Sequence, residues 1–142
     1  MKLRLIADTH GNDLEKIKKN TDCDYIVVLG DFGFTGSNLK KLNKFLEENN
    51  KKILFIDGNH KNYKKLKNIK GTEMFGGKVG IYAKNIYWLK RGEIYEFNNK
   101  RILTFGGAYS VDRFCRIENQ SWFKKEEYSE HDYINLYNHI VK

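Results

Sequence analysis

Carboxylate, imidazole and carboxamide side chains occur in three short segments, each of which follows an apolar run. The segments are Asp8-Thr9-His10-Gly11, Gly30-Asp31 and Gly58-Asn59-His60. Carboxylate and imidazole ligands together suit Zn²⁺ or Mn²⁺, with Fe²⁺ as a further candidate. The glycines before Asp31 and Asn59 allow the chain to turn sharply ahead of those side chains. We therefore expect Asp8, His10, Asp31 and Asn59 to bind a divalent metal ion.

A metal ion held in this way would suit the hydrolysis of a phosphate ester. Metal ions hold the ester and lower the pKa of a bound water to about 7, and a nearby imidazole protonates the leaving oxygen. His60 is the candidate for this acid. Each ligand also has a structural alternative when taken singly, because Asp8 could cap a helix and His10 could be a hydrogen-bonded turn residue.

The first half of the chain alternates between strand and helix patterns. Residues 2–7, 25–29 and 53–56 have the apolar patterns of strands, and helices are expected from residue 12 or 13 to about 20 and after a cap at Ser37. This order favours parallel strands with right-handed crossovers. The three segments should therefore meet at the carboxyl edge of one sheet, where α/β proteins place their sites. Asp57, at the end of the third strand, is expected to be a solvated or capping carboxylate.

The second half predicts a short helix near residues 63–67, two antiparallel strands near 87–97 and 101–105, and a helix from about residue 124. The two strands would join at Asn98-Asn99 and begin a second sheet. His131 and His139 are spaced to lie near one face of the terminal helix. Either could be recruited as a metal ligand, although surface or packing roles are favoured.

Composition limits the remaining alternatives. The 142 residues fit one domain, and no apolar run approaches the ~20 residues of a membrane-spanning helix. The net charge of +8 favours nucleic acid or an acidic protein face as partner, although the lysine pairs also fit solvated helix faces. Cys23 and Cys115 match no zinc or redox spacing, which predicts buried thiols in a cytoplasmic protein.

The three segments resemble the D-x-H, G-D and G-N-H blocks of the calcineurin-like metallophosphoesterases, over about residues 1–120. The resemblance implies an α/β fold, the αββα sandwich. It implies that Asp8 and His10 bind one metal, Asp31 bridges two, Asn59 binds the second and His60 protonates the leaving group. Residues 106–113 with Trp122 resemble a bacterial and phage subgroup of this family. Arg113 or Arg116 would then face the phosphate, with a structural ion pair as the alternative for Arg113.

The sequence departs from the family pattern in three places. No acidic residue follows Asp31 within its block, and Lys61 follows His60, where its charge would disfavour a protonated imidazole. The late metal-ligating histidines of the family, including a Gly-His-x-His block, have no match. We therefore expect one domain (1–142), C-terminally shortened, with a parallel sheet, flanking helices and a partial second sheet. It should bind one ion rather than two, and expose a sheet edge that invites a protein partner or self-association.

Two functions remain open at this point. The missing histidines favour a metal-binding module with a binding or inhibitory role, by analogy with phage inhibitors of nucleic-acid-processing defence enzymes such as anti-CRISPR proteins. The alternative is an active metal-dependent phosphoesterase that hydrolyses a nucleotide or another phosphate ester. A third hypothesis is that the chain is one half of a split enzyme whose other half supplies the histidines.

Overall fold

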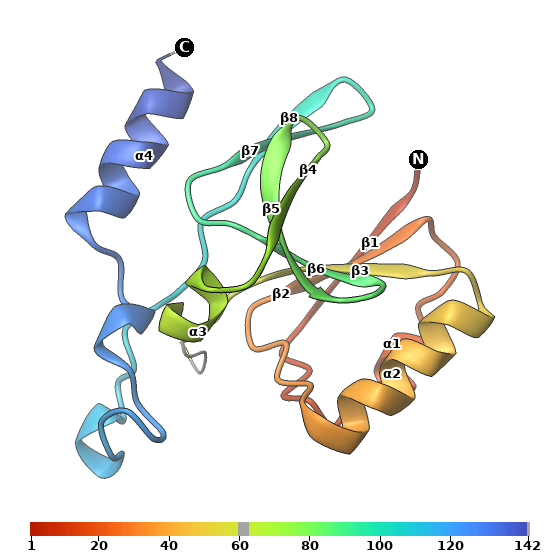
Figure 1. Ribbon diagram of the computed structural model, residues 1–142, viewed down its shortest axis with the longest axis horizontal. Helices are drawn as coiled ribbons and strands as arrows, with labels where there is room; N and C mark the ends of the chain where they lie inside the picture. Colours follow the sequence, from red (N-terminus) through yellow and green to blue (C-terminus); the bar gives the residue numbers. More distant parts are fainter. Residues whose placement is uncertain (60–62, 142) are drawn as a thin grey trace.

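A six-stranded sheet forms the middle layer of the molecule (Figure 1). The computed structural model describes residues 1–59 and 63–141. The strand order is β1-β2-β3-β6-β5-β4, with parallel pairing from β1 to β6 and antiparallel pairing beyond. The strands are β1 (Leu3–Ala7), β2 (Tyr25–Leu29), β3 (Lys52–Ile56), β4 (Gly71–Met74), β5 (Gly77–Ala83) and β6 (Ile86–Leu89). The α/β class and the parallel pairing of the first three strands are confirmed.

Two helices, α1 (Leu14–Lys18) and α2 (Gly36–Glu48), cover one face of this sheet (Figure 1). Ile17, Leu42 and Leu46 from these helices are fully buried in the core that they form with the sheet. The Asp13 carboxylate caps α1 by accepting from the Lys16 N–H at 2.9 Å. The predicted cap at Ser37 is wrong, because α2 begins at Gly36 and its N-cap is Thr35, two residues earlier.

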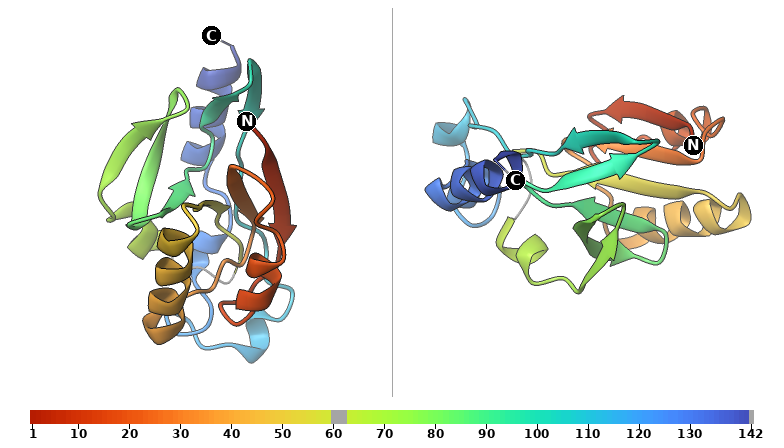
Figure 2. Two further views of the ribbon diagram at one scale, coloured as in Figure 1. Left: turned by 90° about the vertical axis from the view of Figure 1, so that its right-hand side faces the viewer. Right: turned by 90° about the horizontal axis from the view of Figure 1, so that it is seen from above.

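A hairpin of β7 (Ile94–Phe97) and β8 (Lys100–Leu103) lies over the opposite face (Figure 2). It buries Tyr95 and Phe97 against apolar residues of the main sheet. Asn98 and Asn99 form the turn with φ of 51° and 60°, the left-handed backbone that two-residue hairpin turns require. The partial second sheet is thus confirmed. However, the predicted strand 87–97 is two strands, since residues 86–89 pair with β3 in the main sheet.

The chain between β3 and β6 contains the predicted short helix α3 (Tyr63–Lys67) and the β4–β5 hairpin. The hairpin is absent from the sequence-based prediction, because its segment is rich in glycine. No helix in the described part of the chain is long and apolar enough to span a membrane.

The C-terminal segment runs through two 3-10 turns, η1 (Arg113–Cys115) and η2 (Lys124–Glu126), into α4 (Glu130–Ile140). The terminal helix therefore begins at Glu130, six residues after the predicted start near residue 124, and Ser129 is its N-cap. The apolar side chains of α4 and its C-terminal end are largely exposed: Tyr133, Ile134, Tyr137, Ile140 and Val141. Cys23 is buried as predicted, but Cys115 is exposed, which corrects that expectation.

Candidate metal centre

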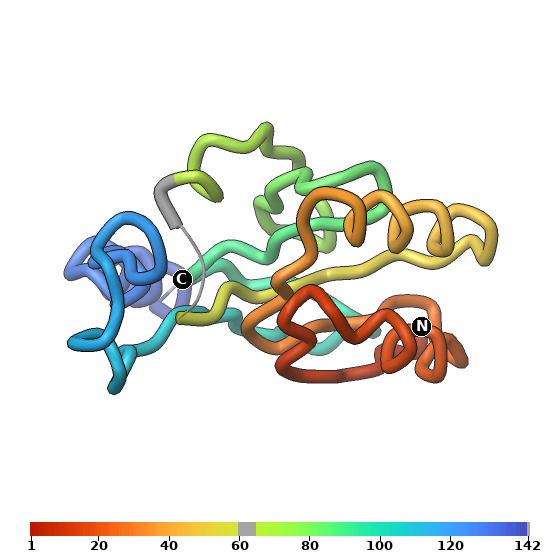
Figure 3. The backbone as a smooth tube through the Cα atoms, turned by 90° about the horizontal axis from the view of Figure 1, so that it is seen from below, coloured from red at the N-terminus to blue at the C-terminus, as the bar shows by residue number. Residues whose placement is uncertain are grey.

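The loops after β1 and β2 bring three predicted ligands together. The ligand atoms of Asp8, His10 and Asp31 all lie within 4.8 Å of one another. Figure 3 shows these two loops side by side, and the His10 N–H donates to the Asp31 carbonyl at 2.9 Å. Asp31 is buried, whereas Asp8 and His10 are exposed. The cluster is therefore assembled and open to solvent.

All three of these residues have a left-handed backbone, with φ of 50° at Asp8, 43° at His10 and 36° at Asp31. Such conformations cost non-glycine residues roughly 1–3 kcal/mol each and concentrate at functional sites. Thr9 helps to hold the first loop, because its buried hydroxyl donates to the Phe32 carbonyl at 2.9 Å. Sequence reasoning missed Thr9, since a threonine between two ligands carries no signal of its own.

Gly58 allows the third loop to approach the second. A Cβ at this position would overlap the Asp31 carboxylate and lie 2.5 Å from the Asp31 nitrogen. Position 58 therefore requires glycine because a side chain there would collide with Asp31. Gly30, by contrast, has the left-handed backbone of the predicted sharp turn, with a φ of 75°. The absent side chain at residue 58 is what allows Asn59 and Asp31 to share one site.

Asn59 and two of the ligands, Asp8 and Asp31, line a depression of about 390 Å³. The Asn59 Nδ2 donates to the Ser110 Oγ at 3.0 Å, so the carboxamide oxygen remains as an acceptor toward a ligand. Ser110 is buried. It lies in the segment 106–113 that the sequence singled out, but a serine there gave no indication of this contact.

Asp57 is the main error among the predictions near the site. It is buried rather than solvated, and the Arg91 Nε donates to its Oδ2 at 2.8 Å. The Trp88 Nε1 donates to its other oxygen at 3.0 Å. Burial raises the pKa of the Asp57 carboxyl, and the Arg91 charge and these hydrogen bonds oppose that rise.

Other predicted residues are not brought into this cluster. Arg113 pairs with Glu127 at 3.4 Å and lies over the Tyr109 ring, and Arg116 pairs with Asp112 at 2.7 Å. Neither arginine is among the described residues that line the depression. His60 lies outside the described residues.

The late histidines are both on α4. His139 Nδ1 lies 2.7 Å from the Gly92 carbonyl, and His131 is exposed. Within residues 1–59 and 63–141, Asp8, His10 and Asp31 are the one group of three His, Cys, Asp or Glu side chains placed to hold a metal ion. A second ion would have only Asp31 and Asn59 from this part of the chain.

The donor set fits a divalent ion. Two carboxylates and an imidazole with an open position are typical of catalytic metal sites. A model of the calcineurin-like phosphoesterase family matches residues 1–141. No curated protein and no solved structure matched the chain. The assembled ligand cluster and this match agree, and the chain belongs to the calcineurin-like phosphoesterase family.

Proposed function

We propose that this protein is a metal-dependent phosphoesterase with one divalent ion at the cluster of Asp8, His10 and Asp31. The observation that carries the proposal is the approach of these ligand atoms to within 4.8 Å at the edge of an open depression. The expected ion is Zn²⁺ or Mn²⁺, with Fe²⁺ as the next candidate. The substrate would be a nucleotide or another phosphate ester.

Each residue has a role in this proposal. Asp8, His10 and Asp31 hold the ion, which supplies a Lewis acid for the ester and an activated water at neutral pH. Asn59 lines the same depression, and because its amide nitrogen donates to Ser110, its oxygen is the atom that would contact a ligand there. His60 remains the predicted proton donor to the leaving oxygen. Arg113 and Arg116 remain predicted phosphate contacts.

A second candidate function is a binding module in which the ion only holds the loops in shape. It is favoured by the position of His139 against the Gly92 carbonyl, because that histidine is then engaged away from the ligand cluster. β1 is an edge strand, and its Leu5 is exposed, which supports the expected protein partner or self-association. Inhibition of a defence enzyme remains a hypothesis from the sequence alone.

Hydrolysis of bis-p-nitrophenyl phosphate separates the two functions. The protein should be assayed with Mn²⁺, Zn²⁺ and Fe²⁺ in turn, beside Asp8→Asn and the control Asp22→Asn, whose carboxylate is exposed and pairs with Lys2. We expect kcat/KM to fall at least ~100-fold in Asp8→Asn and to be unchanged in the control. A wild-type protein that binds metal but hydrolyses nothing would overturn the enzyme and support the binding module.

A further inference from the structure

A second cavity lies beside the metal centre, between α3, η2 and the start of α4. Its volume is about 530 Å³, within the roughly 300–1,000 Å³ of small-molecule sites. We refer to it as the lysine cavity. It is lined by Lys67, Lys124, Lys125, Glu127, Tyr128, Ser129 and Asp132. None of these residues belongs to the proposed ligand set.

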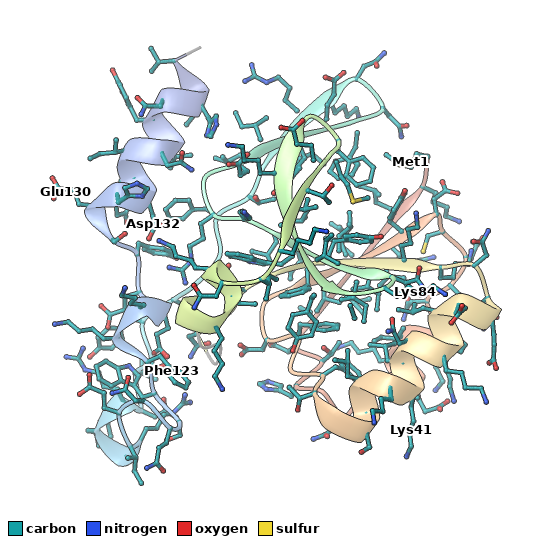
Figure 4. The ribbon with its side chains drawn as sticks, in the orientation of Figure 1. Met1, Lys41, Lys84, Phe123, Glu130 and Asp132 are labelled. Carbon is teal, nitrogen blue, oxygen red and sulfur yellow. The ribbon has the colours of Figure 1, made fainter. Side chains whose placement is uncertain are left out.

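Both carboxylates in the lysine cavity are already engaged. The Asp132 Oδ2 accepts from the Ser129 N–H and hydroxyl, each at 2.8 Å, and lies 3.6 Å from Arg91 NH1. Glu127 pairs with Arg113 at 3.4 Å. Figure 4 shows Asp132 on the side of α4 that faces the domain, whereas Glu130 points away.

Lys124 and Lys125 provide the unbalanced charge. Neither Lys124 nor Lys125 forms an ion pair with any residue in the described ranges. Three lysines line the cavity, against two carboxylates, and those of Asp132 and Glu127 already lie against arginine side chains, Arg91 and Arg113. The local excess of positive charge favours an anionic ligand.

Tyr128 forms a wall between the lysine cavity and the metal-centre depression. It lines the cavity, and its hydroxyl donates to the Gly107 carbonyl at 2.8 Å. Its ring lies 4.7 Å from that of Phe105, and both Phe105 and Gly107 line the depression. A ligand that extends over the Tyr128 side chain would thus contact both the lysine cavity and the metal-centre depression.

Exposed aromatic rings continue from this wall onto α4. Tyr128 is 40% exposed, and Tyr133, whose ring centroid is 5.8 Å away, is 53% exposed. Positive charge that follows a phosphate backbone, together with exposed aromatic rings on which bases stack, is the combination that binds single-stranded nucleic acid.

We propose that the lysine cavity binds a phosphate of a single-stranded nucleic acid, with a neighbouring phosphate at the metal centre. The bases would stack on Tyr128 and Tyr133. This inference rests on the proposed function and names its substrate class. It assigns to Lys124 and Lys125 the contacts that hold an extended substrate but are not needed by a small ester.

The test measures binding of a short fluorescein-labelled oligothymidylate with hydrolysis-resistant phosphorothioate linkages to the Mn²⁺-loaded protein, by fluorescence anisotropy. The variant is Lys124→Gln/Lys125→Gln, and the matched control is Lys40→Gln/Lys41→Gln on α2. Figure 4 shows Lys41 on the opposite side of the molecule from Phe123, which precedes the Lys124-Lys125 pair. We expect about a tenfold rise in Kd for the variant and no change for the control. The slope of log K against log salt should become less steep by about 0.7, the value for one phosphate contact on a single strand.

Bis-p-nitrophenyl phosphate separates this inference from the proposed function. The lysine variant should hydrolyse this small diester at the wild-type rate. If the wild type hydrolyses it and the variant binds the oligonucleotide as tightly as the control does, the lysine cavity is not a nucleic-acid site. Stronger competition by duplex than by single-stranded DNA would overturn the proposed class of nucleic acid. If the wild type does not hydrolyse the diester, the proposed function itself fails.

Discussion

The buried Arg91 guanidinium joins the Asp57 carboxylate to the C-terminal segment of the chain. Arg91 NH2 lies 2.7 Å from Asp57 Oδ2, and both side chains are at most 1% exposed. The guanidinium also donates to three consecutive carbonyl groups, those of Lys125, Glu126 and Glu127. Because Asp57 directly precedes Gly58-Asn59, the same ion pair connects the third metal-site loop to the wall of the lysine cavity.

Replacement of Arg91 should destabilise the fold strongly. In Arg91→Met the Asp57 carboxylate is left buried without its partner, which costs about 3–5 kcal/mol in free energy of unfolding. Urea denaturation measures this loss. The control Glu15→Gln removes the exposed pair with Lys18 and should cost less than ~1 kcal/mol. Equal stabilities for the two variants would show that the buried pair does not hold the segments together.

Gly58→Ala should weaken metal binding more than it weakens the fold. The added Cβ would overlap the Asp31 carboxylate, so the loop or the ligand must move. We expect affinity for Mn²⁺, measured by isothermal titration calorimetry, to fall at least ~10-fold. Gly71→Ala is the matched control, because the nearest atoms to a Cβ there lie at 3.4 and 3.5 Å. Unchanged affinity in Gly58→Ala would contradict the close approach of the two loops.

The parts of the fold that the sequence predicted are those governed by local patterns. Each of the strands β1, β2 and β3 is a continuous apolar segment, or an alternation of apolar and polar residues, that is followed by a polar residue or glycine. The order of these strands determines which sheet edge carries Asp8, Asp31 and Asn59. By contrast, two apolar segments, 86–89 and 94–97, are separated by only four residues, 90–93, and without a proline the turn at Gly92 is a weak break. Two strands in different sheets were therefore predicted as one.

The contacts that position the site arise from distant residues and have no local signature. Asp57 and Arg91 are 34 residues apart, and Asn59 and Ser110 are 51 apart. A charged residue next to a strand is usually solvated, which is why Asp57 was predicted to be so. The left-handed backbone of the three ligands is equally hidden, since non-glycine residues adopt it uncommonly and no local pattern marks where they do.

Ser110→Ala should impair the site without unfolding the protein. It removes the acceptor that orients the Asn59 amide, and loss of such supporting contacts typically costs 10- to 100-fold in metal affinity or activity. We expect a decrease of about tenfold in kcat/KM for bis-p-nitrophenyl phosphate. Ser37→Ala, at an exposed position on α2, is the control. Full activity in Ser110→Ala would show that the Ser110 hydroxyl is not needed to orient the Asn59 amide.

Acid should release the start of α4 through Asp132. Burial alone would raise the pKa of this carboxyl, but the Ser129 donors and the Arg91 charge hold the pKa below its ordinary value. A depressed pKa contributes stability that is present above the unfolded-state value of about 4 and is lost as the pH falls through the folded-state value. Wild type should therefore exceed Asp132→Asn in unfolding free energy at pH 7, and the difference should shrink below about pH 4. A difference that is independent of pH would contradict this role.

The metal content of the protein shows whether Asp8, His10 and Asp31 form a metal centre. Elemental mass spectrometry of the purified protein, after incubation with Mn²⁺ or Zn²⁺ and removal of unbound ion, should find about one ion per chain. The matched sample of Asp31→Ala, which lacks the buried ligand of the cluster, should retain almost none. Equal metal content in the two proteins, or none in the wild type, would contradict a metal centre at Asp8, His10 and Asp31.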